Sequence, residues 1–230
     1  MNKVIDKIKN IEKRLIDTAK KCGRDHDSVK LVAVSKKMSQ ERVRVAIESG
    51  AKILGENYIQ EAREKIEALK EYDVSWHFIG HLQSNKAKYA VKIFDMIHTV
   101  DSVKLAKEID KQAKKIDKIQ EILIQINISE EESKSGVSAD KTIQIIKEIS
   151  RFDNIRIKGL MGMPPYYDNP EMAKPYFVRM KEIQGMIEAE KIEGVLMDEL
   201  SMGMTGDFEV AIQEGSTLVR IGTAIFGARS

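Results

Sequence analysis

The chain has 230 residues, of which 42% are hydrophobic and 32% are charged, close to the averages of soluble globular proteins. This length predicts one large domain or two small ones, and the composition excludes intrinsically disordered, collagen-like and fibrous proteins. Lysine and arginine number 38 against 36 aspartates and glutamates, which leaves a formal net charge of +2. Because no long block of one sign appears, we expect neither a nucleic-acid partner nor a polybasic membrane anchor.

The cysteine content and the first residues indicate the compartment. Cys22 is the single cysteine, so it cannot form an internal disulfide, and residues 1–15 carry charges where a signal peptide has an apolar stretch. The longest apolar runs fall far short of the roughly 20 residues that span a bilayer. We therefore expect a cytoplasmic protein without a membrane segment.

In chain order, an amphipathic helix is predicted first, over residues 3–20. Its apolar face consists of residues spaced three or four apart, namely Val4, Ile8, Ile11, Leu15 and Ala19. From residue 31 onward, short runs rich in Val, Ile and Leu predict eight strands. These runs begin at Leu31, Lys52, Trp76, Ile93, Ile122, Ile155, Val195 and Thr217.

Helical spacing of apolar residues appears between several of these strands, after residues 39, 57, 101 and 138 and again over residues 177–187. Residues suited to begin or end a helix stand beside these segments: Ser39, Asp101 and Ser138 as N-caps, and Gly50 and Gly215 at helix ends. Strands and helices therefore alternate along the chain.

The spacing of the predicted strands indicates the fold. From Leu31 to Leu218 they recur every 27 residues or so, about the length of a strand, a crossover helix and two short loops. This repeat predicts an α/β protein, a single (β/α)8 TIM-like barrel with an extra N-terminal helix. An open doubly wound sheet is the alternative, but the strand count favours the barrel. We expect one domain over residues 1–230, with residues 1–25 forming a helix packed on the barrel.

Unusual side chains follow the predicted strands, where barrels of this kind carry their functional residues. Lys36 shares the alternation of Val32 and Val34, so it is predicted to point into the barrel, while Lys37 points outward. A lysine that loses hydration has a lowered pKa, and its neutral amine can condense with a carbonyl. The alternative is that both lysines end the strand in water.

The segments after the last two predicted strands have the composition of a phosphate site. Residues 201–206 offer two glycines, two hydroxyls and backbone N–H groups before a helix, and residues 222–223 offer similar groups. An ordinary turn before a helix is the alternative for residues 201–206 taken alone.

Two further polar features lie in or beside apolar strands. Arg220 lies within the run LVRIG, so its charge must be paired or serve a ligand; an ion pair with Asp198 or Glu199 is the structural alternative. His77 and His81 are four residues apart, without a cysteine or an HExxH glutamate. A hydrogen-bonded histidine is therefore favoured over a zinc site, and no metal site is predicted.

Eight blocks of sequence carry a resemblance to a known family: VSK (34–36), GENY (55–58), WHFIGHLQ (76–83), QINI (125–128), SKSG (133–136), GLM (159–161), LSMGM (200–204) and VRIGTAIFG (219–227). In this order they resemble the YggS/PROSC family, the pyridoxal-phosphate homeostasis proteins. The resemblance covers roughly residues 30–229. It implies a barrel similar to the N-terminal domain of alanine racemase.

The resemblance also implies a cofactor, pyridoxal 5′-phosphate, bound as a Schiff base to Lys36. It implies that Asn57 lies near the cofactor and Arg220 near its ring nitrogen or phosphate. The phosphate is expected to be held by four residues, Ser201, Gly203, Gly222 and Thr223. Thr205 departs from the family's usual serine but keeps the hydroxyl.

The resemblance implies a binding protein that serves intracellular vitamin B6 homeostasis without strong catalytic activity, so no catalytic residue is assigned. We expect a monomer that has apo pyridoxal-phosphate enzymes as recipients. The alternative is a pyridoxal-phosphate-dependent amino-acid racemase. Racemisation uses a second acid/base group, in alanine racemase a tyrosine from a second domain, for which we expect no sequence because the chain ends soon after the last strand.

Arg220 bears on the same choice, since a cation beside the pyridine nitrogen weakens the ring as an electron sink. A phosphosugar aldolase is the third alternative. It explains neither the eight blocks nor the position of Lys36 after the first strand, and we therefore rank it last.

Overall fold

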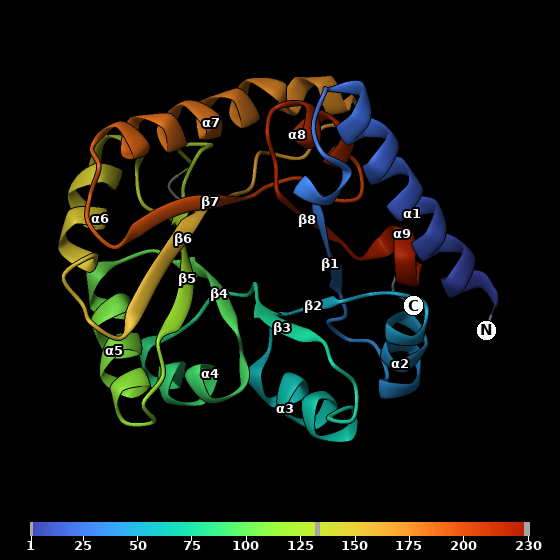
Figure 1. Cartoon of the computed structure of the whole chain (residues 1–230), viewed down its shortest axis with the longest axis horizontal. Coiled ribbons are helices and arrows are strands. Elements are labelled where there is room, and N and C mark those ends of the chain that lie inside the picture. Colours follow the sequence, from blue (N-terminus) through green and yellow to red (C-terminus); the bar gives the residue numbers. More distant parts are fainter. Residues whose placement is uncertain (1, 132–133, 228–230) are drawn as a thin grey trace.

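The structure is a closed barrel of eight parallel strands, arranged in chain order. It is a computed structural model that describes residues 2–131 and 134–227, so part of the 133–136 block lies outside the described residues. The barrel closes where β1 (Lys30–Val34) pairs with β8 (Leu218–Ile221), with Val32 opposite Arg220. Helices surround the ring of strands (Figure 1). The predicted barrel is thus confirmed, and the open sheet is excluded.

The other strands are β2 (Ile53–Glu56), β3 (Ser75–Phe78), β4 (Met96–Val100), β5 (Gln120–Ile126), β6 (Ile155–Gly162) and β7 (Val195–Ser201). The helices are α1 (Asn2–Lys21), α2 (Gln40–Glu48), α3 (Ile59–Ala68), α4 (Ala87–Ile93), α5 (Val103–Lys114), α6 (Thr142–Ile149), α7 (Lys174–Ala189), α8 (Phe208–Gln213) and α9 (Thr223–Phe226). Of these, α4 and α9 were not predicted from the sequence, whereas α8 is the helix predicted to follow residues 201–206.

The predicted helix cap at Ser39 is confirmed, whereas the predicted boundaries at Asp101 and Ile93 are wrong. Ser39 caps α2 by accepting the Arg42 N–H, as predicted. The cap of α5 is Ser102 rather than Asp101, since the Ser102 hydroxyl accepts the Leu105 N–H at 3.3 Å. The fourth strand begins at Met96 and not at Ile93, which is the last residue of α4.

Helix α1 packs on the outside of the barrel against α2, α8 and α9. Its predicted apolar face is buried at Ile8, Ile11, Leu15 and Ala19. Arg14 adds two hydrogen bonds to the Glu209 carboxylate of α8, both at 3.0 Å. The predicted N-terminal helix is therefore present and joined to the last helices of the barrel.

Side chains inside the barrel change from apolar to polar along the strands. An apolar cluster separate from the main core lies inside, formed by Val32, Met96, Leu123, Met161 and Leu218. Because side chains alternate between the two faces of a strand, the residues two positions later also face inward. They include His98, Gln125 and Arg220, so a polar layer follows the apolar cluster toward the carboxyl ends of the strands.

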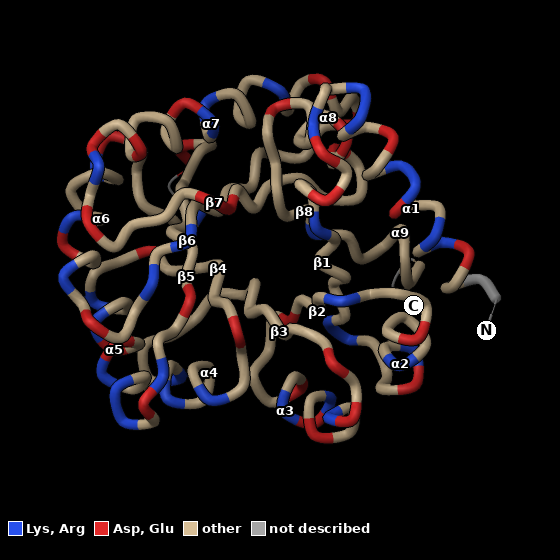
Figure 2. The backbone as a smooth tube through the Cα atoms, viewed as in Figure 1, with Lys and Arg blue, Asp and Glu red and all other residues tan. Residues whose placement is uncertain are grey.

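Charged residues of both signs are spread over the surrounding helices, with fewer on the strands (Figure 2). This distribution agrees with the small net charge of +2. Within residues 2–131 and 134–227, no helix combines the length and the apolar character that crossing a bilayer requires.

Candidate functional site

A cavity of 710 Å³ opens where the strands end, and its wall includes residues that end or follow each of the eight strands. Its size lies within the range of about 300–1,000 Å³ typical of small-molecule sites. Five of the residues predicted to bind the cofactor line it: Lys36, Asn57, Arg220, Gly222 and Thr223. Ser201 and Gly203 do not, whereas Thr205 and Gly206 of the same loop do.

Lys36 enters the cavity from the turn after β1. Val34 and Lys36 both line the cavity, as the alternation predicts, and Lys37 is exposed. Lys37 adopts the left-handed conformation, with φ of 62°. Lys36 is half-buried, so the alternative in which both lysines end the strand in open water is wrong.

Arg220 is 5% exposed and is held by neutral oxygen atoms. Its Nη1 donates to the carbonyl and hydroxyl oxygens of Ser201 at 2.7 and 2.6 Å, and its Nη2 to the Gly162 carbonyl at 3.0 Å. Burial lowers the pKa of Arg220 to about 10, although the charge of Asp207 opposes this shift. The guanidinium therefore remains charged at neutral pH in the cavity wall.

The predicted alternative for Arg220, an ion pair with Asp198 or Glu199, is wrong. Asp198 pairs with Lys158 at 2.8 Å, and Glu199 pairs with Lys30 at 2.5 Å. Among the described residues, no salt bridge to Arg220 is found. A buried cation that has only neutral acceptors is suited to an anionic or electron-rich ligand.

Two buried histidines extend the Arg220 contacts into the barrel. His98 Nδ1 lies 3.0 Å from Ser201 Oγ, and His98 Nε2 lies 2.9 Å from His77 Nδ1. Because a guanidinium can only donate, the Ser201 hydroxyl accepts from Arg220. Both ring nitrogens of His98 are in hydrogen-bond contact, one with Ser201 and the other with His77.

Burial keeps both histidines neutral at pH 7. It lowers the pKa of His77 to about 4 and the pKa of His98 well below its usual value, and for His98 the charges of His77 and Arg220 act in the same direction. The prediction that His77 is a hydrogen-bonded histidine is confirmed. Ser201 lies behind Arg220 in this series of hydrogen bonds, which sequence reasoning did not predict.

The loop after β7 presents Thr205 and Gly206 to the cavity. Gly203 has φ of 89°, and a Cβ there would lie 2.6 Å from the Ala211 Cβ, so this glycine is required for packing against α8. At Gly206, a Cβ would meet no heavy atom within 4 Å. A side chain at Gly206 would therefore meet open space, and Thr205, its neighbour in sequence, also lines the cavity.

Another feature of the cavity wall is the side-chain oxygen of Asn57. Asn57 follows β2 and lines the cavity. Its Oδ1 is buried and has no hydrogen-bond partner among the described residues. Since a buried acceptor without a partner costs about 1–3 kcal/mol, this atom fits a site that a polar ligand completes.

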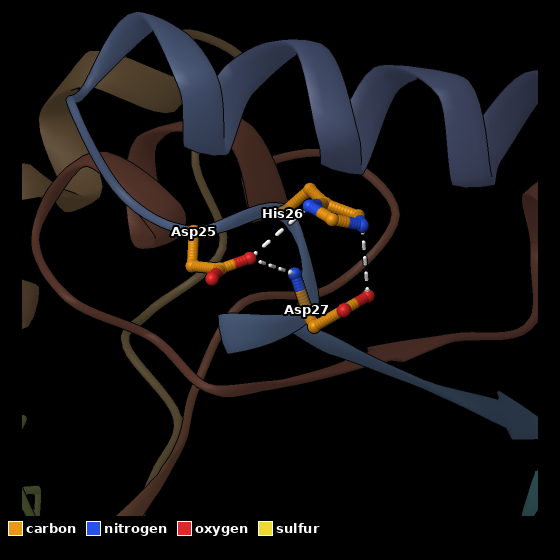
Figure 3. A group of neighbouring side chains, drawn as sticks. All are labelled: Asp25, His26 and Asp27. Carbon is orange, nitrogen blue, oxygen red and sulfur yellow. Dashed lines mark hydrogen bonds and ion pairs between the residues drawn. The ribbon is translucent and has the colours of Figure 1, made fainter.

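One group of residues has metal-ligand geometry elsewhere on the surface. Asp25, His26 and Asp27 place one ligand atom each within 4.8 Å of one another (Figure 3). All three are exposed, and the Asp25 carboxylate already accepts the Asp27 N–H at 3.1 Å to cap a short turn. The close approach of the three side chains is therefore explained by the turn, and we assign no metal to them.

Comparisons with known proteins agree with this geometry. Residues 8–230 match the family described as alanine racemase, N-terminal domain. A pyridoxal phosphate homeostasis protein of Aquifex aeolicus is 40% identical over 224 residues, which cover 97% of each chain. A solved structure of an unknown protein from Bifidobacterium adolescentis is 33% identical, with a TM-score of 0.91 over 98% of this chain and 95% of that one.

The PipY protein of Synechococcus elongatus has been solved with PLP bound. It is 33% identical to this chain, with a TM-score of 0.80 over 87% of this chain and 93% of that one. The resemblance found in the eight sequence blocks is therefore confirmed over nearly the full length. The chain belongs to the family of pyridoxal phosphate homeostasis proteins, built on the barrel of the alanine racemase N-terminal domain.

Proposed function

We propose that this protein holds pyridoxal 5′-phosphate in the cavity and serves vitamin B6 homeostasis by storing and delivering it. The observation that carries the proposal is the meeting of Lys36 and Arg220 in one cavity, from the neighbouring strands β1 and β8. A lysine amine suits the aldehyde of the cofactor, and a buried guanidinium suits its ring nitrogen or its phosphate.

The residues take separate roles toward the cofactor. The Lys36 amine condenses with the aldehyde carbon and water is lost, which gives the bound cofactor a covalent link to the chain. We assign the phosphate to the wall formed by Thr205, Gly206, Gly222 and Thr223. Ser201 then acts behind Arg220, Gly203 acts through the packing of the loop, and Asn57 Oδ1 offers an acceptor.

Homeostasis is favoured over the racemase alternative. The curated relatives, including those of Aquifex aeolicus and Escherichia coli, are named homeostasis proteins and not enzymes. We therefore assign no catalytic residue. The proposal includes apo pyridoxal-phosphate enzymes as recipients and a monomer that forms one barrel domain over residues 1–230. It also places the protein in the cytoplasm, since Cys22 is a free, exposed thiol as expected in a reducing compartment.

Reductive trapping tests the assignment of Lys36. The protein is incubated with pyridoxal phosphate, reduced with borohydride and mapped by peptide mass spectrometry. We expect a pyridoxyl adduct on Lys36 that is lost in Lys36→Ala and kept in Lys37→Ala, the matched control at the exposed neighbour. An adduct on Lys37, or no adduct, would contradict the proposed function.

A further inference from the structure

A group of buried charged residues lies behind the turn that carries Lys36. It consists of Glu56 at the end of β2 with Lys65 and Glu61 of α3, whose side chains are 0%, 3% and 25% exposed. None of the three is among the residues that line the cavity. Any effect of this charged group on a ligand must therefore pass through other residues.

The turn after β1 has a conformation that requires support. The Met38 N–H donates to the Ser35 carbonyl at 3.0 Å, so residues 35–38 form a tight turn with Lys36 in its second position. Lys37, in the third position, has φ of 62°. A left-handed conformation costs a residue other than glycine about 1–2 kcal/mol, so contacts elsewhere must hold this turn.

The charged group supplies these contacts on both sides of Lys36. Before it, the Ser35 hydroxyl donates to Glu56 Oε1 at 2.6 Å, and Lys65 Nζ donates to the Ser35 carbonyl at 2.6 Å. After it, the Lys37 N–H donates to Glu61 Oε1. The residues before and after Lys36 are thus both bound to side chains that arise from β2 and α3.

Lys65 joins these contacts into one unit. Its ammonium donates to Glu56 Oε1 at 2.8 Å and to Glu61 Oε1 at 2.6 Å, in addition to the Ser35 carbonyl. An ammonium has three donors, and these three acceptors use all of them. Removing Lys65 would therefore free one contact to the turn and loosen both carboxylates that provide the others.

Stability alone is a weak reason for this arrangement. Well-packed apolar residues often serve as well as a buried ion pair, because desolvation offsets the attraction between the charges. Apolar side chains could not, however, hydrogen-bond Ser35 or the Lys37 N–H. What the charged group adds is therefore the set of hydrogen bonds that hold the turn.

We propose that Lys65, with Glu56 and Glu61, is a positioning residue that fixes the turn so that the Lys36 amine reaches a carbonyl in the cavity. This inference rests on the proposed function of Lys36. When the turn relaxes, the amine is within reach of the carbonyl for less of the time, so covalent attachment weakens. Binding through the phosphate and Arg220 does not involve the turn and is retained.

The test compares two ligands that differ at the reacting carbon. Pyridoxal phosphate has the aldehyde, whereas pyridoxine 5′-phosphate has an alcohol there and binds without a covalent bond. In Lys65→Met, we expect borohydride trapping on Lys36 to slow by about tenfold or more, as misplaced reactive groups do. The dissociation constant for pyridoxine phosphate should change less than about twofold. Lys70→Met, at the exposed Lys70, is the matched control.

Two further variants separate positioning from folding. Glu61→Ala removes the acceptor of the Lys37 N–H but leaves the Glu56 and Lys65 pair intact, so it should slow trapping in the same way without leaving a buried charge alone. Lys65→Met/Glu56→Gln removes both buried charges together. Circular dichroism and urea unfolding establish that each variant tested is folded.

Each outcome decides the inference. Unchanged trapping in folded Lys65→Met or Glu61→Ala would overturn it, and so would equal losses for pyridoxal phosphate and pyridoxine phosphate, which would indicate a structural role. Failure of the unaltered protein to form any adduct on Lys36 would instead overturn the proposed function, so the two failures are distinguishable.

Discussion

Arg220 donates to the Ser201 hydroxyl at 2.6 Å, and through this bond the cation in the cavity wall is joined to the buried histidines of β3 and β4. The guanidinium is thus oriented by a hydroxyl and by backbone carbonyls rather than by a carboxylate. Among the described residues no carboxylate forms a salt bridge with it, although the charge of Asp207 in the same cavity wall acts on it.

The first prediction concerns Ser201. Ser201→Ala leaves His98 Nδ1 and one donor contact of Arg220 without the hydroxyl. The free energy of unfolding should fall by about 1–3 kcal/mol, as it does when a buried polar group loses its partner. Urea unfolding measures this loss. Ser150→Ala, at an exposed hydrogen bond, should change the free energy of unfolding by less than about 0.5 kcal/mol; equal effects would contradict the prediction.

The second prediction concerns pH. Burial lowers the pKa of His77 to about 4, whereas the unfolded chain has the ordinary histidine value of about 6.5. Below pH 6.5 the unfolded state therefore binds a proton that the folded state does not, and stability decreases as pH falls toward 4. His98, lowered in the same direction, adds to this effect. Each histidine contributes about 1.4 kcal/mol per pH unit.

Urea unfolding between pH 6.5 and 5.0 checks this dependence. Glutamine does not titrate, so His77→Gln should reduce the slope of unfolding free energy against pH. His81→Asn, at an exposed histidine, is the control and should leave the slope unchanged. A slope in His77→Gln equal to that of the unaltered protein would show that His77 is not the titrating group.

Most of the fold could be predicted from the sequence because the strands are short apolar runs at an even interval. The boundary at Ile93 could not, since only Asp95 separates the apolar residues Ile93 and Phe94 at the end of α4 from the buried strand β4. A run of this kind has no periodicity that separates a helix end from a buried strand. Helix α4 was missed because it is only seven residues long, too short to show the spacing of a helix.

The candidate site could be predicted only where it continues a strand. Lys36 lies two residues beyond Val34, so the alternation of β1 gives its direction. The loop after β7 has no such period, and the sequence could not show that Thr205, rather than Ser201, faces the cavity. The burial of Lys65 was also hidden, because a lysine among charged residues on a helix is typical of a solvent-exposed face.

The third prediction distinguishes the roles of Gly203 and Gly206 in the loop after β7. Gly206→Val should weaken binding of pyridoxal phosphate several-fold or more, because the new side chain occupies open space at the cavity wall. Its free energy of unfolding should change by less than about 0.5 kcal/mol. Gly203→Val should instead destabilise the fold by at least about 1 kcal/mol, since a Cβ there clashes with Ala211 and φ is positive.

Pyridoxal, which lacks the phosphate, provides the control for this pair. It should bind the unaltered protein more weakly than pyridoxal phosphate, and Gly206→Val should affect it less. Equal losses for the two ligands would place the phosphate elsewhere in the cavity.

The last prediction is that the loaded protein delivers its cofactor without racemising amino acids. Racemisation uses an acid/base group on each face of the reacting carbon, and Lys36 supplies one amine. Of the tyrosines that line the cavity, Tyr166 is 84% exposed, and Tyr167 shares a hydrogen bond with Tyr176 at 3.0 Å. That hydrogen bond raises the pKa of Tyr167, which disfavours the phenolate that a second base would require.

The loaded protein mixed with L-alanine should therefore show no D-alanine above the background of free pyridoxal phosphate, measured by chiral chromatography. Mixed with an apo pyridoxal-phosphate enzyme, it should restore the activity of that enzyme. Lys36→Ala is the control, since it cannot carry covalently bound cofactor into the assay. Sustained racemisation that disappears in Lys36→Ala would favour the enzyme alternative, because turnover would then depend on the same amine that we assign to storage.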